Sequence, residues 1–262
     1  MLFYSLVFCA LNSAPIMAAE IASNRVDHAL WQQFLDEYVV THPDGINRVR
    51  YAKVTAADKK HLQQYLQQLQ NMRVSKLTRD EQLAYWINLY NALTVNVILQ
   101  HYPTDSIRNI NISGWFSTGP WKKELIKVEN KNLSLNDIEH RILRIQWQDN
   151  RIHYALNCAS LGCPNLNPQA FTSTNLQDLL NNSAKNYINH SRGVTIKNNR
   201  LIISTIYKWY AEDFGGNDAA IIAQLQRYAS PALKLKLQKF NKIDGYAYNW
   251  QLNDVFDFVP KP

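Results

Sequence analysis

The chain has 262 residues, of which 46% are hydrophobic, 11% aromatic and 19% charged, and its net charge at pH 7 is +7. This composition excludes a disordered protein and fits one globular domain, which at this length buries about three quarters of the surface that its unfolded chain exposes. The basic excess is moderate, so charge alone does not indicate a nucleic-acid partner.

The first 19 residues have the layout of a secretory signal peptide. They carry no charged side chain, residues 2–11 are mostly apolar, and small or helix-breaking residues follow as far as Ala19. The apolar stretch is too short for a membrane span, and no later run approaches the roughly 20 residues that a span requires. The alternative is a buried N-terminal helix. We expect a signal peptide at 1–19, a single globular domain over 20–262, a periplasmic or secreted location, and no stable membrane insertion.

Three helices are expected in the first part of the chain. Apolar residues at helical spacing predict the first over about 26–40, and Thr55 with Asp58 resembles a capping box before the second. Thr78 and Glu81 form a capping box before the third, QLAYWINLYNALTVNVILQ, which has almost no polar face. A helix that is apolar all round is a buried one.

Asn88 and Asn91 fall inside this buried helix. A buried amide group without a partner costs about 1–3 kcal/mol. Both side chains are therefore expected to bind a neighbouring backbone segment or to line a functional site.

The rest of the chain alternates short helices and hairpins. Residues 103–123 are expected to be irregular. The expected elements are a hairpin over 125–133, a helix capped by Ser134 and Asp137 that runs to about 146, a hairpin turning at Asn198-Asn199, helices over 206–213 and 218–229, and a half-buried strand in which Tyr246, Tyr248, Trp250 and Leu252 alternate. Together the elements predict a helix-rich α+β domain with a small antiparallel sheet.

Glu139 occupies a costly position in the helix predicted over 135–146. At 100° per residue it lies within the apolar arc, whereas His140 lies on the opposite, polar side. A carboxylate in the apolar arc must be paired, or its pKa rises through desolvation. Glu139 is therefore either a structural residue that holds an amide or an arginine, or a member of a functional site. His140 alone would be a solvated surface histidine.

The densest cluster of chemically reactive residue types is RIHYALNCASLGCP, at 151–164. In a strand or in a helix, His153 and Asn157 project together. A straight strand would separate His153 from Cys158 by roughly 16 Å, so the histidine serves a Cys158 nucleophile only if the chain bends between them. A Cys158–Cys163 disulfide requires only Cα atoms within about 7 Å, which the turn at Gly162 permits.

Cysteine arithmetic favours this disulfide. Export would remove Cys9 with the leader and leave two nearby cysteines in an oxidising compartment. His140, His153, Cys158 and Cys163 are numerous enough to hold a metal, but their spacing matches no usual zinc pattern. No Walker, GxGxxG or HExxH motif is present either, and we predict no metal and no cofactor.

Two further surface features remain. The lysines between 234 and 242 form a basic run of the usual solvated kind, and no nucleic-acid partner is predicted. The chain contains 7 Trp and 14 Tyr residues, which either fill the core or line a carbohydrate or peptide groove. Trp86 and Trp209 are the binding candidates among them.

Several segments together resemble a known family, the domain of unknown function 547. These segments are YWINLYNA at 85–92, LSLNDIEHRILR at 133–144, RIHYALNCASLGCP at 151–164, LIISTIYKWYAEDF at 201–214 and YNWQLN at 248–253, so that the resemblance spans about 80–255. Carried over residue by residue, the motifs point to Asn88, Glu139, His140, His153, Asn157, Cys158, Ser160 and Cys163. One departure is Asn249, where the family motif suggests Asp.

The resemblance implies no established reaction. Bacterial members of the family look like exported proteins, and eukaryotic relatives join the domain to others that include glutaredoxin-like ones, which suggests thiol chemistry.

Two functions are compatible with these features. The first is a thiol-dependent enzyme, a hydrolase, a transferase or a thiol–disulfide exchanger, in which Cys158 attacks a carbonyl or a disulfide. A histidine would lower the pKa of Cys158, and Glu139 or Asn88 would orient that histidine. Papain-like and transglutaminase-like folds, with a buried helix packed on a small antiparallel sheet, offer an analogy at the level of the fold.

The second function is a non-enzymatic periplasmic binding or structural domain. Cys158–Cys163 is then a structural disulfide, and Asn88, Glu139 and His153 form a buried polar network. In both cases the bound partner is a small molecule or a peptide of unknown identity.

The leader gives the first testable prediction. Export should remove about the first 19 residues, because an uncharged apolar stretch is followed by small residues at Ala18 and Ala19. Mass spectrometry of protein purified from the periplasm measures the new N-terminus. An intact Met1 on folded, soluble protein would contradict the prediction.

Overall fold

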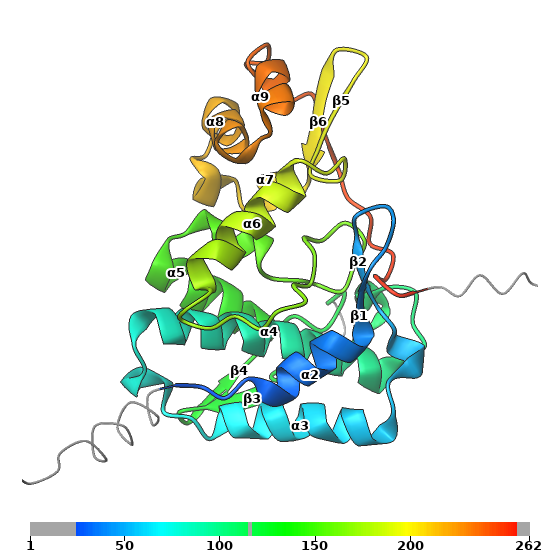
Figure 1. The fold of residues 1–262 in the computed structure, drawn as a ribbon, viewed down its shortest axis with the longest axis vertical. Helices are drawn as coiled ribbons and strands as arrows, with labels where there is room; N and C mark the ends of the chain where they lie inside the picture. Colours follow the sequence, from blue (N-terminus) through cyan, green and yellow to red (C-terminus); the bar gives the residue numbers. More distant parts are fainter. Residues whose placement is uncertain (1–24, 115–116, 256–262) are drawn as a thin grey trace, which may run out of the picture.

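The computed structural model describes residues 25–114 and 117–255 (Figure 1), so the expected leader at 1–19 lies outside the described residues. The helices are α2 (Ala29–Tyr38), α3 (Ala56–Gln70), α4 (Arg79–His101), a π-helix (Asp137–Leu143), α5 (Arg144–Trp147), α6 (Leu176–Ile188), α7 (Ile206–Trp209), α8 (Asp218–Tyr228) and α9 (Pro231–Leu237). The strands are β1 (Val39–Thr41), β2 (Asn47–Val49), β3 (Ile126–Val128), β4 (Lys131–Leu133), β5 (Val194–Lys197), β6 (Arg200–Ser204) and β7 (Gly245–Ala247).

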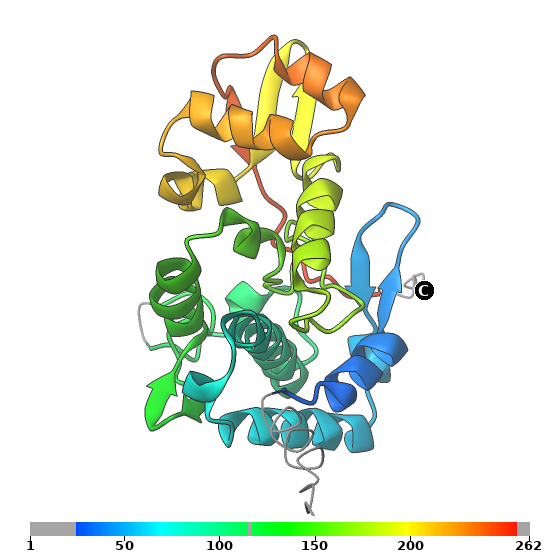
Figure 2. The same cartoon turned by 60° about the vertical axis from the view of Figure 1, so that its left-hand side comes forward.

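The predicted fold class, a helix-rich α+β domain, is confirmed. The molecule is elongated, with α2, α3 and α4 in its lower part and α8, α9 and the β5–β6–β7 sheet in its upper part (Figures 1 and 2). One apolar core surrounds α4, and a second lies between the three-stranded sheet and α8. The long helix α6 runs between the two parts and contributes buried residues to both cores.

Helix α4 is buried along most of its length, as its apolar sequence predicts. Thr78 caps it, accepting the Glu81 backbone N–H at 3.4 Å. The Glu81 carboxylate does not complete a capping box, because it accepts the backbone N–H groups of Val26 at 2.7 Å and Ser173 at 3.3 Å. It therefore ties two distant segments to the start of α4.

The two buried asparagines of α4 hold irregular backbone. Asn88 donates to the Phe171 carbonyl at 2.7 Å and accepts the Phe171 N–H at 3.0 Å. One turn further on, Asn91 donates to the Ala155 carbonyl at 2.9 Å and accepts the Asn157 N–H at 2.9 Å. Each amide supplies the donor and acceptor that a neighbouring strand would otherwise provide, which is the backbone role expected for a buried amide.

The sheets are small and partly different from the prediction. The β3–β4 hairpin and the β5–β6 hairpin form as expected, and Asn198 and Asn199 turn the latter with φ of 51° and 57°. The last strand is shorter than predicted: β7 pairs parallel with β6 and ends at Ala247. Beyond that point the backbone bonds to the loop that contains Cys158 and Cys163, so Tyr248 and Trp250 leave the sheet.

Three other points concern the expected fold. Helix α4 packs mainly against α3 and the π-helix. The papain-like and transglutaminase-like analogy stays a prediction. Helix α6 was not predicted from the sequence, although its apolar residues are at helical spacing from Leu176 to Ile188. No helix within residues 25–114 and 117–255 combines the length and hydropathy that crossing a membrane requires.

Asn91 gives a stability prediction. Replacing Asn91 with Ala leaves the Ala155 carbonyl and the Asn157 N–H buried without their partner, which should lower the free energy of unfolding by about 2–4 kcal/mol. Urea denaturation measures the loss. Gln63→Ala, at an exposed site on α3, is the control and should change stability by less than about 0.5 kcal/mol. Equal stability of the two variants would refute the backbone-clamp role of Asn91.

Candidate functional site

A cavity of about 210 Å³ lies where the two parts of the molecule meet. Its walls come from α4, the π-helix, the 153–164 segment, α7 and the segment after β7. The lining residues are Tyr90, Trp121, Asn136, Glu139, His140, His153, Leu156, Cys158, Cys163, Pro164, Ile206, Trp209, Tyr210, Tyr248 and Trp250. Aromatic rings, acid–base groups and sulfur atoms thus line the same cavity.

Four aromatic rings form a continuous cluster at this cavity. Trp121 contacts Trp250 with ring centroids 5.7 Å apart, Trp250 contacts Tyr248 at 4.7 Å, and Tyr248 contacts Trp209 at 4.8 Å. Trp209 is 45% exposed although it is large and apolar. An exposed tryptophan at the edge of an aromatic cluster is typical of a surface that binds a ligand.

Cys158 and Cys163 form a disulfide with Cα atoms 6.2 Å apart, as the turn between them allows. The Tyr248 hydroxyl lies 3.0 Å from each sulfur atom and accepts a hydrogen bond from the Ser160 hydroxyl at 3.1 Å. The Cys158 backbone N–H donates to the Cys163 sulfur at 2.9 Å. Cys158 is half-buried and Cys163 is only 3% exposed, so the two sulfur atoms differ in accessibility.

The loop that carries the disulfide is held by side chains from several elements. Asn157 accepts the Ala159 N–H at 2.8 Å and donates to the Pro164 carbonyl at 2.7 Å, which closes the loop on itself. Tyr187 of α6 donates to the Gly162 carbonyl at 2.7 Å. These bonds do not involve the sulfur atoms, so the loop conformation has support independent of the disulfide.

The segment after β7 covers the other side of this loop. The Gly162 N–H donates to the Asn249 carbonyl at 2.8 Å, and the Leu161 N–H donates to the Gln251 carbonyl at 2.8 Å. A Cβ atom at Gly162 would lie 2.7 Å from the Asn249 nitrogen, so this close approach requires glycine. Asn249, where the family motif suggests Asp, acts here through its backbone and accepts the Gln251 N–H with its side chain.

His153 lies between two carboxylates. It ends a 3₁₀ segment (Asn150–Tyr154), and its Nε2 is 2.7 Å from the Asp213 carboxylate. Its Nδ1 is 3.6 Å from Glu139 Oε1, and its ring stacks on Tyr210 with centroids 4.0 Å apart. The His153 side chain is only 2% exposed. The arrangement is therefore a buried Asp–His–Glu cluster.

The charges in this cluster support each other. Burial alone would lower the pKa of His153, but its hydrogen bond to Asp213, the proximity of Glu139 and the negative charges of both acids raise that pKa above the ordinary value of 6.5. Burial alone would raise the pKa of Glu139, but the proximity and charge of His153 hold that pKa below its ordinary value. The same balance keeps the pKa of Asp213 low. The two acids thus favour the protonated form of His153, and His153 favours the ionised forms of the acids.

Arg144 completes the cluster. Its guanidinium group makes two bonds to Asp213, at 2.5 Å and 2.8 Å, and its Nη1 lies 2.9 Å from His140 Nδ1. With Arg144 and His153 opposing Asp213 and Glu139, the cluster has no large net charge. Because every charged group has an opposite partner, the cost of burying the cluster is partly offset.

Five of the predicted site residues line the cavity together. They are Cys158, His153, Glu139 and His140, which were predicted as catalytic residues, and Cys163, which was predicted as a binding residue. Trp209 joins them at the cavity as a sixth. His153 and Asn157 do not project together as expected, because the chain leaves its 3₁₀ turn between them and Asn157 binds the disulfide loop instead.

The other predicted site residues lie elsewhere. Asn88 holds Phe171 and contacts His28, so it does not orient His153, and the expected network of Asn88 with Glu139 is absent from the described residues. Trp86 is buried against Tyr85 and lines a separate groove. Ser160 is 1% exposed and touches Tyr248 and the Cys158 sulfur from behind the cavity wall.

His140 corrects the helical projection. Residues 137–143 form a π-helix, in which each N–H bonds five residues back, so each turn holds more residues than the 3.6 assumed in the projection. Glu139 is buried as predicted, but His140 lines the cavity with its ring beside Tyr210. Ile145, which a helical projection at 100° per residue also places in the apolar arc, is 65% exposed.

The sequence reading missed the partners that shape the site. Asp213 and Tyr210 lie 60 and 57 positions from His153 along the chain, and no spacing rule joins them. The sequence contained one indication of these partners. The acidic pair Glu212-Asp213 follows Trp209-Tyr210 within the helix expected over 206–213. Tyr248 was predicted as a strand residue, and its place against the sulfur atoms depends on β7 ending early.

Comparison with known proteins identifies the middle of the chain. Residues 74–188 match the family described as Protein of unknown function, DUF547. This segment is a DUF547 domain. It contains α4, the π-helix, the disulfide loop and α6, whereas Asp213 and Tyr248 lie beyond the end of the match. No curated protein and no solved structure matches the chain.

The described residues hold no group of three or more His, Cys, Asp or Glu side chains that could bind a metal ion. In the DUF547 domain, His153 lies between Glu139 and Asp213, and the two cysteines are joined. The arrangement supplies buried charges, aromatic faces and one disulfide.

The His153 cluster gives a prediction about pH. A histidine whose pKa is raised by folding stabilises the protein below its unfolded pKa of 6.5, and this contribution disappears as the pH rises through the folded pKa. The difference in unfolding free energy between wild type and His153→Gln should therefore be larger at about pH 5.5 than at about pH 9. Urea titrations at both pH values measure it, and a difference independent of pH would contradict the protonated state of His153.

Proposed function

We propose that the protein performs thiol–disulfide exchange at Cys158–Cys163, as an exported DUF547 protein in the periplasm or outside the cell. The observation that carries this proposal is the environment of the disulfide: it lines a cavity, and the Tyr248 hydroxyl is 3.0 Å from both sulfur atoms. The substrate class is a small molecule or a peptide that carries thiol groups.

The difference in accessibility assigns the two sulfur roles. An incoming thiolate attacks the half-buried Cys158 sulfur and forms an S–S bond to it, while the Cys158–Cys163 bond breaks and its electron pair leaves on Cys163. A second thiolate of the same substrate then attacks the substrate sulfur of this mixed disulfide and releases Cys158 as a thiolate. The substrate dithiol is oxidised by two electrons, and the protein disulfide is reduced by two.

Hydrogen-bond donors favour Cys163 as the leaving group. The Cys158 backbone N–H already points at the Cys163 sulfur at 2.9 Å. Burial raises the pKa of Tyr248, so its hydroxyl stays protonated and donates to a sulfur that becomes negative. Donors aimed at the site of developing charge lower the pKa of the departing thiol and speed its departure.

The surrounding groups support a bound substrate. Trp209, Trp250 and Trp121 offer apolar faces beside the disulfide, and the protonated His153 in the same cavity wall favours an incoming thiolate. Glu139 limits this effect because it pairs with His153.

Variants with one cysteine test this assignment. In Cys163→Ser, Cys158 should form a mixed disulfide with glutathione disulfide at least about tenfold faster than Cys163 does in Cys158→Ser. Mass spectrometry of samples quenched in acid measures both rates. Tyr248→Phe should slow reduction of the wild-type disulfide by a thiol, whereas Tyr246→Phe, an exposed tyrosine two residues away, should leave the rate unchanged.

A structural disulfide would behave differently. Closing a loop of this length stabilises a protein by about 2 kcal/mol in the loop-entropy model, so reduction would lower the melting temperature slightly. Two results together would refute thiol–disulfide exchange and support the non-enzymatic domain. Both thiols of the folded, reduced protein would react equally slowly with a thiol-labelling reagent, and Tyr248→Phe would not change the rate at which the disulfide is reduced.

A further inference from the structure

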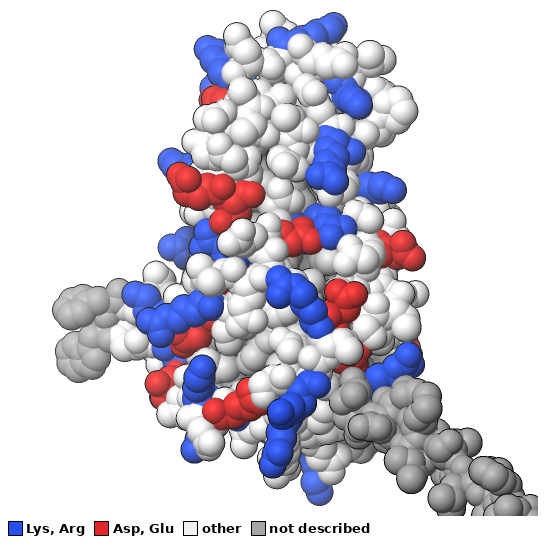
Figure 3. Space-filling model, turned by 90° about the vertical axis from the view of Figure 1, so that its left-hand side faces the viewer, with Lys and Arg blue, Asp and Glu red and all other residues white. Residues whose placement is uncertain are grey.

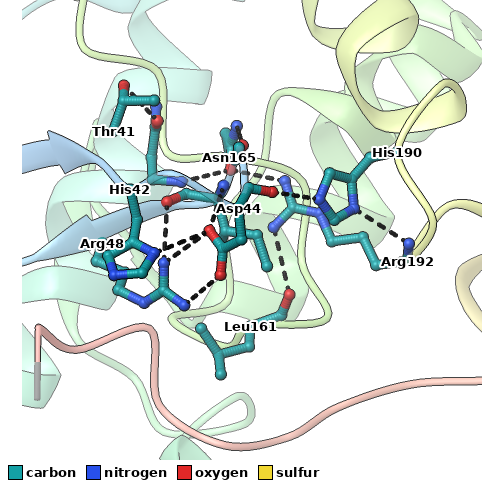
Figure 4. Close-up of polar contacts among 11 residues, drawn as sticks. Thr41, His42, Asp44, Arg48, Leu161, Asn165, His190 and Arg192 are labelled. Atoms are coloured by element: carbon teal, nitrogen blue, oxygen red, sulfur yellow. Dashed lines mark hydrogen bonds and ion pairs between the residues drawn. The ribbon is translucent and has the colours of Figure 1, made fainter.

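A second cavity, of about 550 Å³, lies between the β1–β2 turn, the loop that follows Cys163 and the C-terminal end of α6. Figure 4 shows residues that meet beside it: His190 and Arg192 lie together and point toward Asp44 of the β1–β2 turn and Asn165 of the loop. The lining contains several asparagines and the basic side chains of Lys185, His190 and Arg192, but no Asp or Glu. A cavity of this size falls within the range of small-molecule sites.

Arg192 is the most informative residue at this cavity. Its Nη1 donates to the Leu161 carbonyl at 3.2 Å, its Nη2 donates to Asn165 Oδ1 at 2.6 Å, and its guanidinium lies over the Tyr187 ring at 5.4 Å. All three partners are neutral. The buried Nε has no hydrogen-bond partner among the described residues. A guanidinium has five N–H donors, so three have no protein acceptor in this part of the structure.

The nearby carboxylate does not neutralise Arg192. Asp44 bonds through both oxygens to Arg48, at 2.6 Å and 2.9 Å, and lies 3.3 Å from His42 Nδ1 (Figure 4). Lys185 is exposed at the edge of the cavity and forms no ion pair with any described residue. The cavity therefore has two cations that contact no carboxylate. Burial lowers the pKa of Arg192 to about 10, and the charge of Asp44 offsets this effect only in part.

This unbalanced charge is not general on the protein. On the face drawn in Figure 3, Lys and Arg side chains are interspersed with Asp and Glu in the middle and lower parts, whereas the upper end carries mainly Lys and Arg. At the first cavity, His153 contacts a carboxylate, and so does Arg144 beside it. Burying an arginine that has only neutral hydrogen-bond partners costs free energy unless an anion binds it. The strong interactions of a guanidinium group are charge-assisted hydrogen bonds to an oxyanion.

We propose that this second cavity binds a hydroxyl-rich oxyanion, a sugar acid or a sugar phosphate. The carboxylate or phosphate oxygens bind Arg192 and Lys185. The hydroxyl groups bind amide and hydroxyl side chains of the rim, Asn186 and Ser183, whose polar atoms make no hydrogen bond with the described residues. This site is separate from disulfide exchange and does not depend on it.

Lys185 provides the sharpest variant, because it is exposed and has no structural contact whose loss would unfold the protein. Lys60 is the matched control: it is an exposed lysine on another helix, α3, and also forms no ion pair with the described residues. Lys185→Gln and Lys60→Gln therefore remove the same charge, inside and outside the cavity. Arg192→Gln is the second variant, and a thermal melt establishes whether it folds.

Isothermal titration calorimetry of the mature protein tests the site with three probes: glucuronate, glucose 6-phosphate and glucose. At least one of the two anions should bind, and which one binds distinguishes a carboxylate from a phosphate ligand. Lys185→Gln should weaken that binding by about tenfold, folded Arg192→Gln should abolish it, and Lys60→Gln should leave it unchanged. Higher salt should weaken it as well.

Two results would overturn the oxyanion site. One is the absence of binding by both anions up to about 10 mM. The other is binding that Lys185→Gln does not weaken, or that glucose reproduces with the same affinity. Disulfide exchange is measured separately with the cysteine variants, so failure of either proposal leaves the other intact.

Discussion

The structure depends on satisfying the backbone of an irregular segment that crosses its interior. Residues 155–164 form no helix or strand, yet nearly all of them are buried. Each buried N–H and C=O there needs a partner, since an unpaired one costs about 1–3 kcal/mol. Asn91 from α4, Asn157 from the segment itself and Tyr187 from α6 supply partners. The long buried helix α4 therefore has two roles: it forms part of the apolar core, and its Asn91 side chain binds the backbone of the loop.

A second constraint acts on the charges beside this loop. His153 cannot be buried alone as a cation, and neither Glu139 nor Asp213 can be buried alone as an anion. The π-helix brings Glu139 to one side of the imidazole, and the turn after α7 brings Asp213 to the other. Arg144 then balances the second acid. Removing one member would leave an opposite charge unpaired, so these residues act as one unit spread over four elements.

The sequence predicted local structure well and long-range partners poorly. The long apolar helix, the caps at Thr55 and Thr78 and the turn at Asn198 depend on neighbours in the chain, and they formed as expected. The cost of a buried carboxylate also identified Glu139 correctly. Asp213 could not be assigned, because its pairing with His153 depends on how the turn after α7 lies against the 3₁₀ segment that carries His153. Asn88 was misassigned for the same reason: burial predicts that an amide has a partner, but does not identify it.

The position of the disulfide is hard to explain by stability. Asn157, Tyr187 and the backbone of residues 249–253 already fix the loop in the folded state. Separately, the loop that the disulfide closes is short, so the cross-link removes only a modest amount of entropy from the unfolded chain. A staple would serve equally well deep in either core. Instead the bond lines a cavity, with one half-buried sulfur, one buried sulfur and a neutral hydroxyl between them. The asymmetry matters for exchange and would be irrelevant to a staple, because only exchange distinguishes the sulfur that is attacked from the sulfur that leaves.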